Sequence, residues 1–227
     1  IVGGLEHMHH IPMVSGIDLN PKLFTRTSKG ALMMGITAEF LAQTHGISRE
    51  EQDAFALASH QKATAAYADG VPHGNGEVAS ATGCGAFANE LIPIYGRDEA
   101  GKRILIERDQ CVRPDASMES LAALPPAFMP GMGTVTAGNS SPLNDGAAAL
   151  LIMSEERAKS LGLKPLVKIR STAIAGVDPS IMGTGPVPAT KKALKRAVLK
   201  LEDIDLIELY ESFASQALAC MRLLKLD

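Results

Sequence analysis

The chain has 227 residues, 46% of them hydrophobic, and a formal net charge of −3 at pH 7. This length allows one large domain or two smaller ones around a substantial core. The charge shows no basic stripe of the kind that binding to nucleic acid or an anionic membrane requires. No apolar run approaches the roughly 20 residues that span a bilayer. We therefore expect a soluble, globular protein.

The cysteines are odd in number and widely spaced, at Cys84, Cys111 and Cys220. The absence of a Cys-x-x-Cys pair argues against a disulfide framework or a zinc finger. We therefore expect a reducing compartment. The favoured location is the cytoplasm, and an organelle is the alternative. The sequence starts with Ile-Val-Gly-Gly, without an initiator methionine or a signal peptide, and so resembles the interior of a longer polypeptide.

The first third of the sequence predicts one short strand and two helices. Residues 1–4 are typical of the end of a buried strand, and 35–46 have helical spacing with a glycine as C-cap. Ser48-Arg-Glu-Glu51 is a capping box that opens a long alanine-rich helix ending near Gly70. Residues 71–85 lack periodicity and predict a surface loop.

The middle of the sequence predicts short elements. Residues 91–95 favour an edge strand, because Pro93 cannot donate a ladder hydrogen bond. A second strand is expected at 104–107. Residues 117–124 predict a short helix that two prolines end.

The last third alternates apolar runs with helical patterns. We expect strands at 147–154, 166–175 and 204–209, the first of them continuously buried, and helices at 155–161, 189–199 and 212–224. Alternation of this kind indicates parallel βαβ units and an α/β fold. The basic residues of the middle helix are expected to form a solvated face: Lys191, Lys192, Lys195 and Arg196.

The run from Gly133 to Ala149 is unusually poor in bulky side chains. It contains no aromatic residue and one charge, Asp145, while small residues fill most of the rest. Thr134-Val-Thr136 predicts a short strand, and the turn at 138–142 would expose hydroxyl and backbone N–H groups. This composition favours close approach to a long polar ligand.

Several segments together follow the pattern of one enzyme family in order. They are residues 2–8, 33–39, 45–50, 133–149, 178–183, 185–189 and 211–214. Through them the chain resembles the thiolases, which cleave or form the carbon–carbon bond of 3-ketoacyl-CoA. The Met-Met-Gly form and the His7 segment are most similar to the bacterial fatty-acid β-oxidation branch.

The resemblance implies an incomplete α/β fold, the layered α/β/α fold of thiolases, with an α-rich loop domain inserted. Residues 1–4 would end the N-terminal α/β domain, and 5–142 would form the loop domain that binds coenzyme A. Residues 143–163 would be the last strand and helix of the N-terminal domain. Residues 164–227 would begin the C-terminal α/β domain.

The resemblance also implies residues that bind coenzyme A or acyl-CoA, which are substrates rather than tightly bound cofactors. Ser141 matches the serine on the pantetheine arm, and Ala137 matches a small residue of the same tunnel. Arg113 matches the arginine against the adenine end, where a guanidinium plane can stack and meet phosphate. Met34 and Phe213 match apolar residues beside the pantetheine and acyl groups, although their pattern alone would place both in a core.

Thiolases use a nucleophilic cysteine, a Gly-His-Pro histidine and an acid/base cysteine, and none of these motifs occurs in this sequence. We therefore expect the chain by itself to be inactive. Tyr210 stands where thiolases usually have the Asn or His that holds an oxyanion-stabilising water. Pro125 replaces a usual arginine, and residues 71–85 look inserted. Alternatives are a non-catalytic thiolase-like protein that binds acyl-CoA or acts as a structural subunit, and an unrelated α/β domain.

A histidine cluster and a lone cysteine each allow two interpretations. His7, His9 and His10 could bind zinc together with Glu6, but two of these histidines fit the thiolase pattern, which involves no metal, so we expect no metal site. Cys84 lies between glycines and could be a nucleophile, although an exposed thiol in an inserted loop is the favoured interpretation.

Cys111 and Cys220 are expected at a strand edge and on a helix face. Besides acyl-CoA, the resemblance implies a homo-oligomer and a partner β-oxidation subunit. The net charge and the lack of a long apolar run predict no nucleic-acid partner and no membrane span.

Overall fold

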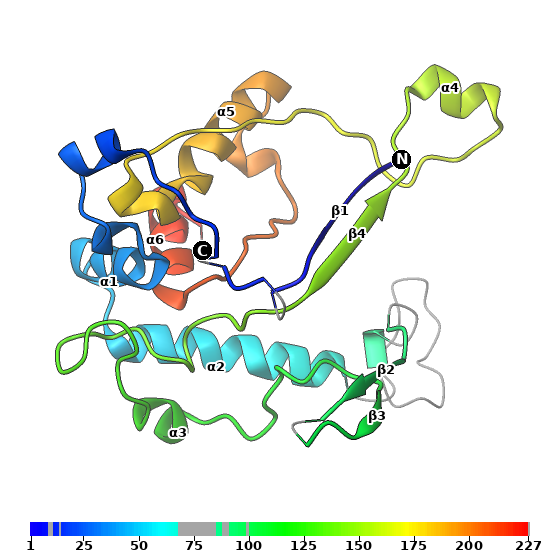
Figure 1. Ribbon diagram of the computed structural model, residues 1–227. Coiled ribbons are helices and arrows are strands. Elements are labelled where there is room, and N and C mark those ends of the chain that lie inside the picture. The colour runs from blue at the N-terminus through cyan, green and yellow to red at the C-terminus, as the bar shows by residue number, and fades with distance from the viewer. Residues whose placement is uncertain (9–10, 14, 68–84, 88–90, 99, 227) are drawn as a thin grey trace. The chain divides into compact units, whose positions relative to one another are not determined.

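The computed structural model describes residues 1–8, 11–13, 15–67, 85–87, 91–98 and 100–226 (Figure 1). These residues form two compact units. The first unit comprises Ile1–Ile47 and Ser141–Asp227, and the second comprises Ser48–Ser140. Most of the predicted loop at 71–85, with Cys84, lies outside the described residues.

The core of the first unit is helical. Helix α1 (Met34–Thr44) packs against helix α6 (Ala214–Leu224) and against the 3-10 helix Pro179–Thr184. Gly183 permits this close packing, because a Cβ there would lie 2.7 Å from Cγ of Gln216 and 2.8 Å from Cδ1 of Leu41. Leu41 is fully buried in the resulting core. The predicted helices 35–46 and 212–224 are thus confirmed, with ends shifted by one or two residues.

The C-terminus of α1 has the geometry that its sequence predicts. Gly46 adopts a positive φ of +60°, which glycine tolerates best. The N–H of Ile47 then donates to the carbonyl of Ala42 over 2.8 Å, as in a Schellman-type cap. The side chain of Ile47 is buried beside Ala42 as a result.

The first unit also contains one antiparallel strand pair. Strand β1 (Val2–Glu6) pairs with β4 (Gly146–Leu150), Val2 lying opposite Leu150 (Figure 1). Strands at 1–4 and near 147–154 are confirmed, but their predicted burial is wrong, because all residues of both strands are exposed. Helix α4 (Glu155–Ser160) follows where a helix was predicted, and Ser154, which the prediction placed in the strand, caps it.

Two predicted strands are absent from the described chain. Residues 166–175 and 204–209 form no strand, and the described sheets are two antiparallel pairs rather than parallel βαβ units. A strand needs the N–H and C=O groups of a neighbouring strand, and the described residues offer none at these positions. Apolar character alone therefore led to the wrong assignment: Leu166 and Ile174 are almost completely exposed.

Helix α5 (Pro186–Ala197) instead binds part of the segment 166–175. Lys192 Nζ donates to the carbonyl of Ile174 over 3.2 Å, and Arg196 Nη1 donates to that of Thr172 over 2.6 Å. The hydroxyl of Ser171 donates to Ala193 O over 2.8 Å. The basic face predicted as merely solvated thus binds backbone carbonyls through two of its four members.

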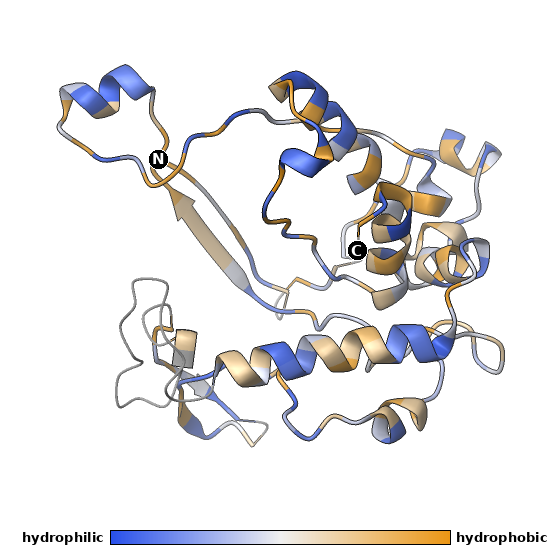
Figure 2. Cartoon of the chain, turned by 180° about the vertical axis from the view of Figure 1, so that it is seen from behind, coloured by the Kyte–Doolittle hydropathy of each residue, from blue (hydrophilic) through white to orange (hydrophobic). Residues whose placement is uncertain are grey.

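The second unit is built on the long helix α2 (Arg49–Ala66), which packs against the short helix α3 (Met118–Ala122). Hydrophilic and hydrophobic residues alternate along α2 (Figure 2). Both helices begin with a capping box. In the predicted box of α2, Ser48 Oγ accepts from the N–H of Glu51, whose carboxylate accepts from the N–H of Ser48 over 2.8 Å.

A β-hairpin completes the described part of the second unit. Strand β2 (Ile94–Arg97) pairs antiparallel with β3 (Arg103–Ile106), with Ile94 opposite Ile106. The predicted edge strand 91–95 is thus displaced toward the C-terminus. The displacement follows from Pro93, which has no N–H for a ladder and precedes the first paired residue.

Removal of the α2 cap should destabilise the chain measurably. We expect Ser48→Ala to lower the free energy of unfolding by about 1 kcal/mol, because it leaves the N–H of Glu51 without its side-chain acceptor. Urea unfolding followed by far-UV circular dichroism measures this change. Ser48→Asp keeps an acceptor and should stay close to the original chain; equal stability of all three proteins would contradict the prediction.

Candidate functional site

The first part of the glycine-rich run, residues 133–140, is a packed element of the second unit. Val135, Thr136 and Asn139 are buried, and Thr134–Thr136 is not a strand, contrary to the prediction. A Cβ on Gly138 would lie 2.5 Å from Cδ1 of Leu124, so close packing excludes bulk here. The small residues in this part of the run thus serve internal packing. Sequence composition alone attributes the small residues of the whole run to the approach of a ligand.

Side-chain hydrogen bonds replace the expected strand ladder. The N–H of Thr136 donates to Asn139 Oδ1 over 2.8 Å, and the N–H of Gly138 donates to the Thr136 hydroxyl over 3.2 Å. Ser140 Oγ donates to the carbonyl of Thr136 over 2.6 Å. Asn, Ser and Thr side chains that bind the local backbone in this way favour turns over strands.

A buried polar network anchors this turn to α2. Asn139 Nδ2 donates to Asp53 Oδ1 over 2.9 Å, and Arg49 Nε donates to Asp53 Oδ2 over 2.7 Å. Gln52 Nε2 adds a hydrogen bond of 3.0 Å to the hydroxyl of Thr134. Sequence reasoning missed these residues. The only local signal was the spacing of Arg49 and Asp53, four residues apart on the predicted helix.

Ser141, the first residue of the run in the first unit, lies beside the segment that precedes α6. Its backbone N–H donates to the carbonyl of Ser212 over 2.9 Å. Phe213, the next residue and the N-cap of α6, is half-buried. The structure thus places two of the predicted ligand-binding residues, Ser141 and Phe213, within one short region.

The other predicted site residues are distributed over both units. Met34 is the first residue of α1 and is 41% exposed, so it is not a core residue. Tyr210 is 76% exposed, four residues before α6. Ala137 and Arg113 belong to the second unit, where both are exposed. The predicted set thus combines residues of both units.

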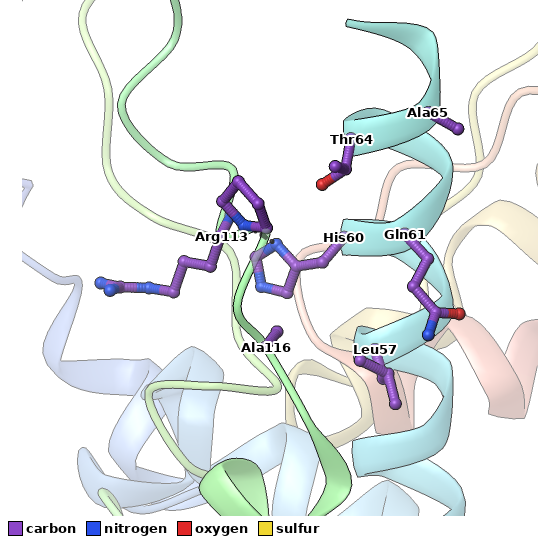
Figure 3. A pocket seen from close by; sticks show the side chains of 8 residues that line it. Leu57, His60, Gln61, Thr64, Ala65, Arg113 and Ala116 are labelled. Atoms are coloured by element: carbon purple, nitrogen blue, oxygen red, sulfur yellow. Dashed lines mark hydrogen bonds between the residues drawn. The ribbon is translucent and has the colours of Figure 1, made fainter. Parts of the chain in front are cut away.

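Arg113 borders a cavity of about 280 Å³ along α2 (Figure 3). The lining residues are Leu57, His60, Gln61, Thr64, Ala65, Arg113, Pro114 and Ala116. The N–H of Arg113 donates to His60 Nδ1 over 3.3 Å, which fixes the backbone at the rim. The guanidinium of Arg113 points away from His60 and Thr64. Thr64 Oγ1 is buried and has no hydrogen-bond partner in the described chain.

The pKa values of Asp178 and Cys220 are shifted by their surroundings. The hydroxyl and the N–H of Ser180 bind the carboxylate of Asp178 and lower its pKa, so Asp178 serves as an N-cap. Burial raises the pKa of the Cys220 thiol, which lies within 3.1 Å of the carbonyl of Gly183. Cys220 thus lies on a helix face as predicted, whereas Cys111 lies in a turn after β3 rather than in a strand.

The described residues contain no group of three side chains arranged to hold a metal ion. His7 Nδ1 lies 3.0 Å from a carboxylate oxygen of Asp145. His9 and His10 lie outside the described residues. No described helix has both the length and the apolar character that crossing a membrane requires.

Two family models together match nearly the whole chain: the N-terminal domain of thiolase over residues 1–156 and its C-terminal domain over 163–227. The chain is 52% identical over 222 residues to a 3-ketoacyl-CoA thiolase of Marinomonas sp. (strain MWYL1), and the match covers 98% of this chain and 53% of that protein. It is 54% identical over 226 residues to one of Marinobacter nauticus, covering 100% of the chain and 54% of that protein. The chain therefore spans about half the length of these relatives.

Solved structures show the same likeness. The human mitochondrial 3-ketoacyl-CoA thiolase matches with a TM-score of 0.74 and 39% identity, covering 99% of this chain and 56% of that one. An acetyl-CoA acetyltransferase of Bacillus anthracis matches with a TM-score of 0.69 and 43% identity, covering 86% and 45%.

The resemblance and the predicted fold class, a partial thiolase-like α/β fold, are thus confirmed, while the fourfold domain division stays a prediction. Both family models and the relatives, over nearly the full sequence, lead to one conclusion: the chain belongs to the thiolase family.

Proposed function

We propose that this chain is the coenzyme A-binding part of an acyltransferase that cleaves 3-ketoacyl-CoA by thiolysis to acyl-CoA and acetyl-CoA, or catalyses the reverse condensation. The observation that carries the proposal is the position of the run at 133–149, where the N–H of Ser141 is bound to the carbonyl of Ser212 next to Phe213. Relatives that are named 3-ketoacyl-CoA thiolase support it. Coenzyme A is a substrate in this proposal, and no cofactor is tightly bound.

The proposed contacts follow the polarity of coenzyme A. Ser141 and Ala137 line the pantetheine arm, and Met34 and Phe213 contact its apolar part and the acyl group. The exposure of Ala137 and Met34 supports these roles, because neither side chain is used in a core.

The adenine end of coenzyme A is assigned to the region around Arg113. The backbone of Arg113 is held by His60, while its guanidinium points outward, where phosphate groups can reach it (Figure 3). The neighbouring cavity has mostly apolar walls and one polar atom without a partner in the described chain, Thr64 Oγ1, a composition common at small-molecule sites.

Binding of coenzyme A tests this assignment. We expect calorimetry to detect binding to the 227-residue chain and Arg113→Ala to weaken the affinity about tenfold, the loss of one charge-assisted contact. Arg157→Ala removes an exposed arginine of α4 outside the proposed site and should leave the affinity unchanged. Absence of heat with the original chain would contradict the proposal.

The catalytic step needs residues that the sequence does not contain. A thiolate must attack the keto carbon, and a second group must move a proton. We therefore expect the 227 residues alone not to consume acetoacetyl-CoA in a thiolysis assay. Cysteine-dependent turnover above the background rate would overturn this expectation.

Tyr210 favours a second candidate function. It occupies the proposed oxyanion position, but its phenol is much longer than the usual amide or imidazole and is 76% exposed. A non-catalytic thiolase-like protein that binds acyl-CoA or serves as a structural subunit would tolerate this change. Reading the gene beyond residues 1 and 227 distinguishes the two, because an upstream catalytic cysteine and a downstream Gly-His-Pro exclude a binding-only role.

Cys220 is not a substitute nucleophile. Its thiol is fully buried, and burial raises its pKa, an effect that the hydrogen bond from Gln216 only partly offsets. The folded chain therefore keeps this thiol protonated to higher pH than the unfolded chain does. We expect iodoacetamide to modify Cys111 before Cys220 in the folded chain and both equally in urea, as peptide mass mapping shows. Equal rates without urea would contradict this.

The remaining parts of the proposal concern location and assembly. A cytoplasmic homo-oligomer with a partner β-oxidation subunit is consistent with bacterial relatives such as those from Marinomonas and Marinobacter. Light scattering of the purified chain, alone and mixed with a β-oxidation subunit, tests the assembly.

A further inference from the structure

Asp53 is a buried charge on helix α2 that contacts a segment distant in sequence. Asp53 is 1% exposed. One carboxylate oxygen accepts a hydrogen bond from Arg49 Nε at 2.7 Å, and the other accepts one from Asn139 Nδ2 at 2.9 Å. A buried carboxylate is tolerated when its partners satisfy both oxygens. Asp53 therefore couples the position of Asn139 to helix α2.

Arg49 holds the other side of this carboxylate in place. Its Nη2 donates to the carbonyls of Leu121 at 2.7 Å and Leu124 at 3.0 Å, at the C-terminal end of α3. A guanidinium at that end also meets the negative pole of the helix. Asp53 is consequently fixed relative to both helices of the second unit.

The amide of Asn139 can adopt only one orientation in this network. Its nitrogen donates to Asp53 and, over 3.1 Å, to the carbonyl of Thr134, while its oxygen accepts from the N–H of Thr136. A flipped amide would place its oxygen against two other oxygens and its nitrogen against an N–H. Asn139 thus closes the turn that contains Ala137 and leads to Ser141.

We propose that Asp53 is a positioning residue for ligand binding: through Asn139 it fixes the conformation of residues 134–141 and thereby sets the affinity for coenzyme A. Neither Asp53 nor Asn139 contacts the ligand in this account, and both are buried. The inference rests on the proposed function, because it assumes that Ala137 and Ser141 contact coenzyme A.

Asn139→Asp is the most informative substitution. It keeps the shape of the side chain but replaces the donor to Asp53 with a second carboxylate, and Arg49 is the cation that contacts Asp53. Two carboxylates in contact share a proton when the pH is lowered, and the shared proton restores a donor between them. The defect should therefore be reversed by acid, whereas a general loss of packing would not be.

The experiment measures two quantities on the 227-residue chain: the affinity for coenzyme A by calorimetry, and amide hydrogen exchange of residues 134–141 without ligand. At about pH 7.5 we expect Asn139→Asp and Asp53→Asn each to weaken binding about tenfold and to accelerate exchange at the Thr136 amide about tenfold. At about pH 5.5 the affinity of Asn139→Asp relative to the original chain should recover at least threefold.

The double variant Asp53→Asn/Asn139→Asp supplies the rescue. The amide introduced at position 53 can donate to the carboxylate introduced at position 139, so the double variant should bind more tightly than the product of the two single effects. Asn20→Asp is the matched control, because Asn20 accepts a hydrogen bond from Lys22 N–H that a carboxylate can also accept. It should change neither quantity at either pH.

Three outcomes would overturn the inference. They are weaker binding without faster exchange at 134–141, faster exchange with unchanged affinity, and a double variant whose loss equals the product of the single losses. Failure of the original chain to bind coenzyme A would contradict the proposed function as well. Slow amide exchange at residues 134–141 in the original chain, and faster exchange in the variants, would then show that the network itself is present. Far-UV circular dichroism of each variant verifies folding, and Asp53→Asn alone carries the test where Asn139→Asp does not fold.

Discussion

The second unit depends on the requirement that a buried carboxylate has partners for both of its oxygens. Asp53 meets this requirement with one cation and one amide, which come from helix α2 and from the glycine-rich run. Removing Arg49 would leave an uncompensated buried charge, at a typical cost of about 3–5 kcal/mol. Removing Asn139 would leave one carboxylate oxygen without its donor, at a typical cost of about 1–3 kcal/mol. Helix packing and the conformation of the run are therefore not independent, because the same charge links them.

Local rules in the sequence identified the helices well. The capping box at Ser48 and the glycine at position 46 have the predicted geometry, because each signal depends on residues at most a few positions apart. The network of Asp53 and Asn139 could not be predicted in this way. Its two residues are separated by 86 positions, and only folding brings them together.

Strand prediction failed for a different reason. The segments at 166–175 and 204–209 have the apolar composition of strands, but composition does not supply a pairing neighbour, and the described chain has none there. The site residues came from the resemblance to thiolases and not from periodicity. Periodicity alone would have placed Met34 in the core, but its side chain is exposed. Only the structure could reveal that Ser141 lies beside Ser212.

The packing of α1 against α6 has a consequence for how this protein can be divided. Residues 1–156 match one family model and residues 163–227 match another. Leu41 lies in the first range and Ala219 in the second, yet both belong to one hydrophobic cluster. The hydroxyl of Ser215 also donates to the carbonyl of Ala38 in that core. Exchange of the C-terminal segment with that of a relative would therefore cut through a hydrophobic core. A chimera of two thiolases should carry α1 and α6 from the same parent.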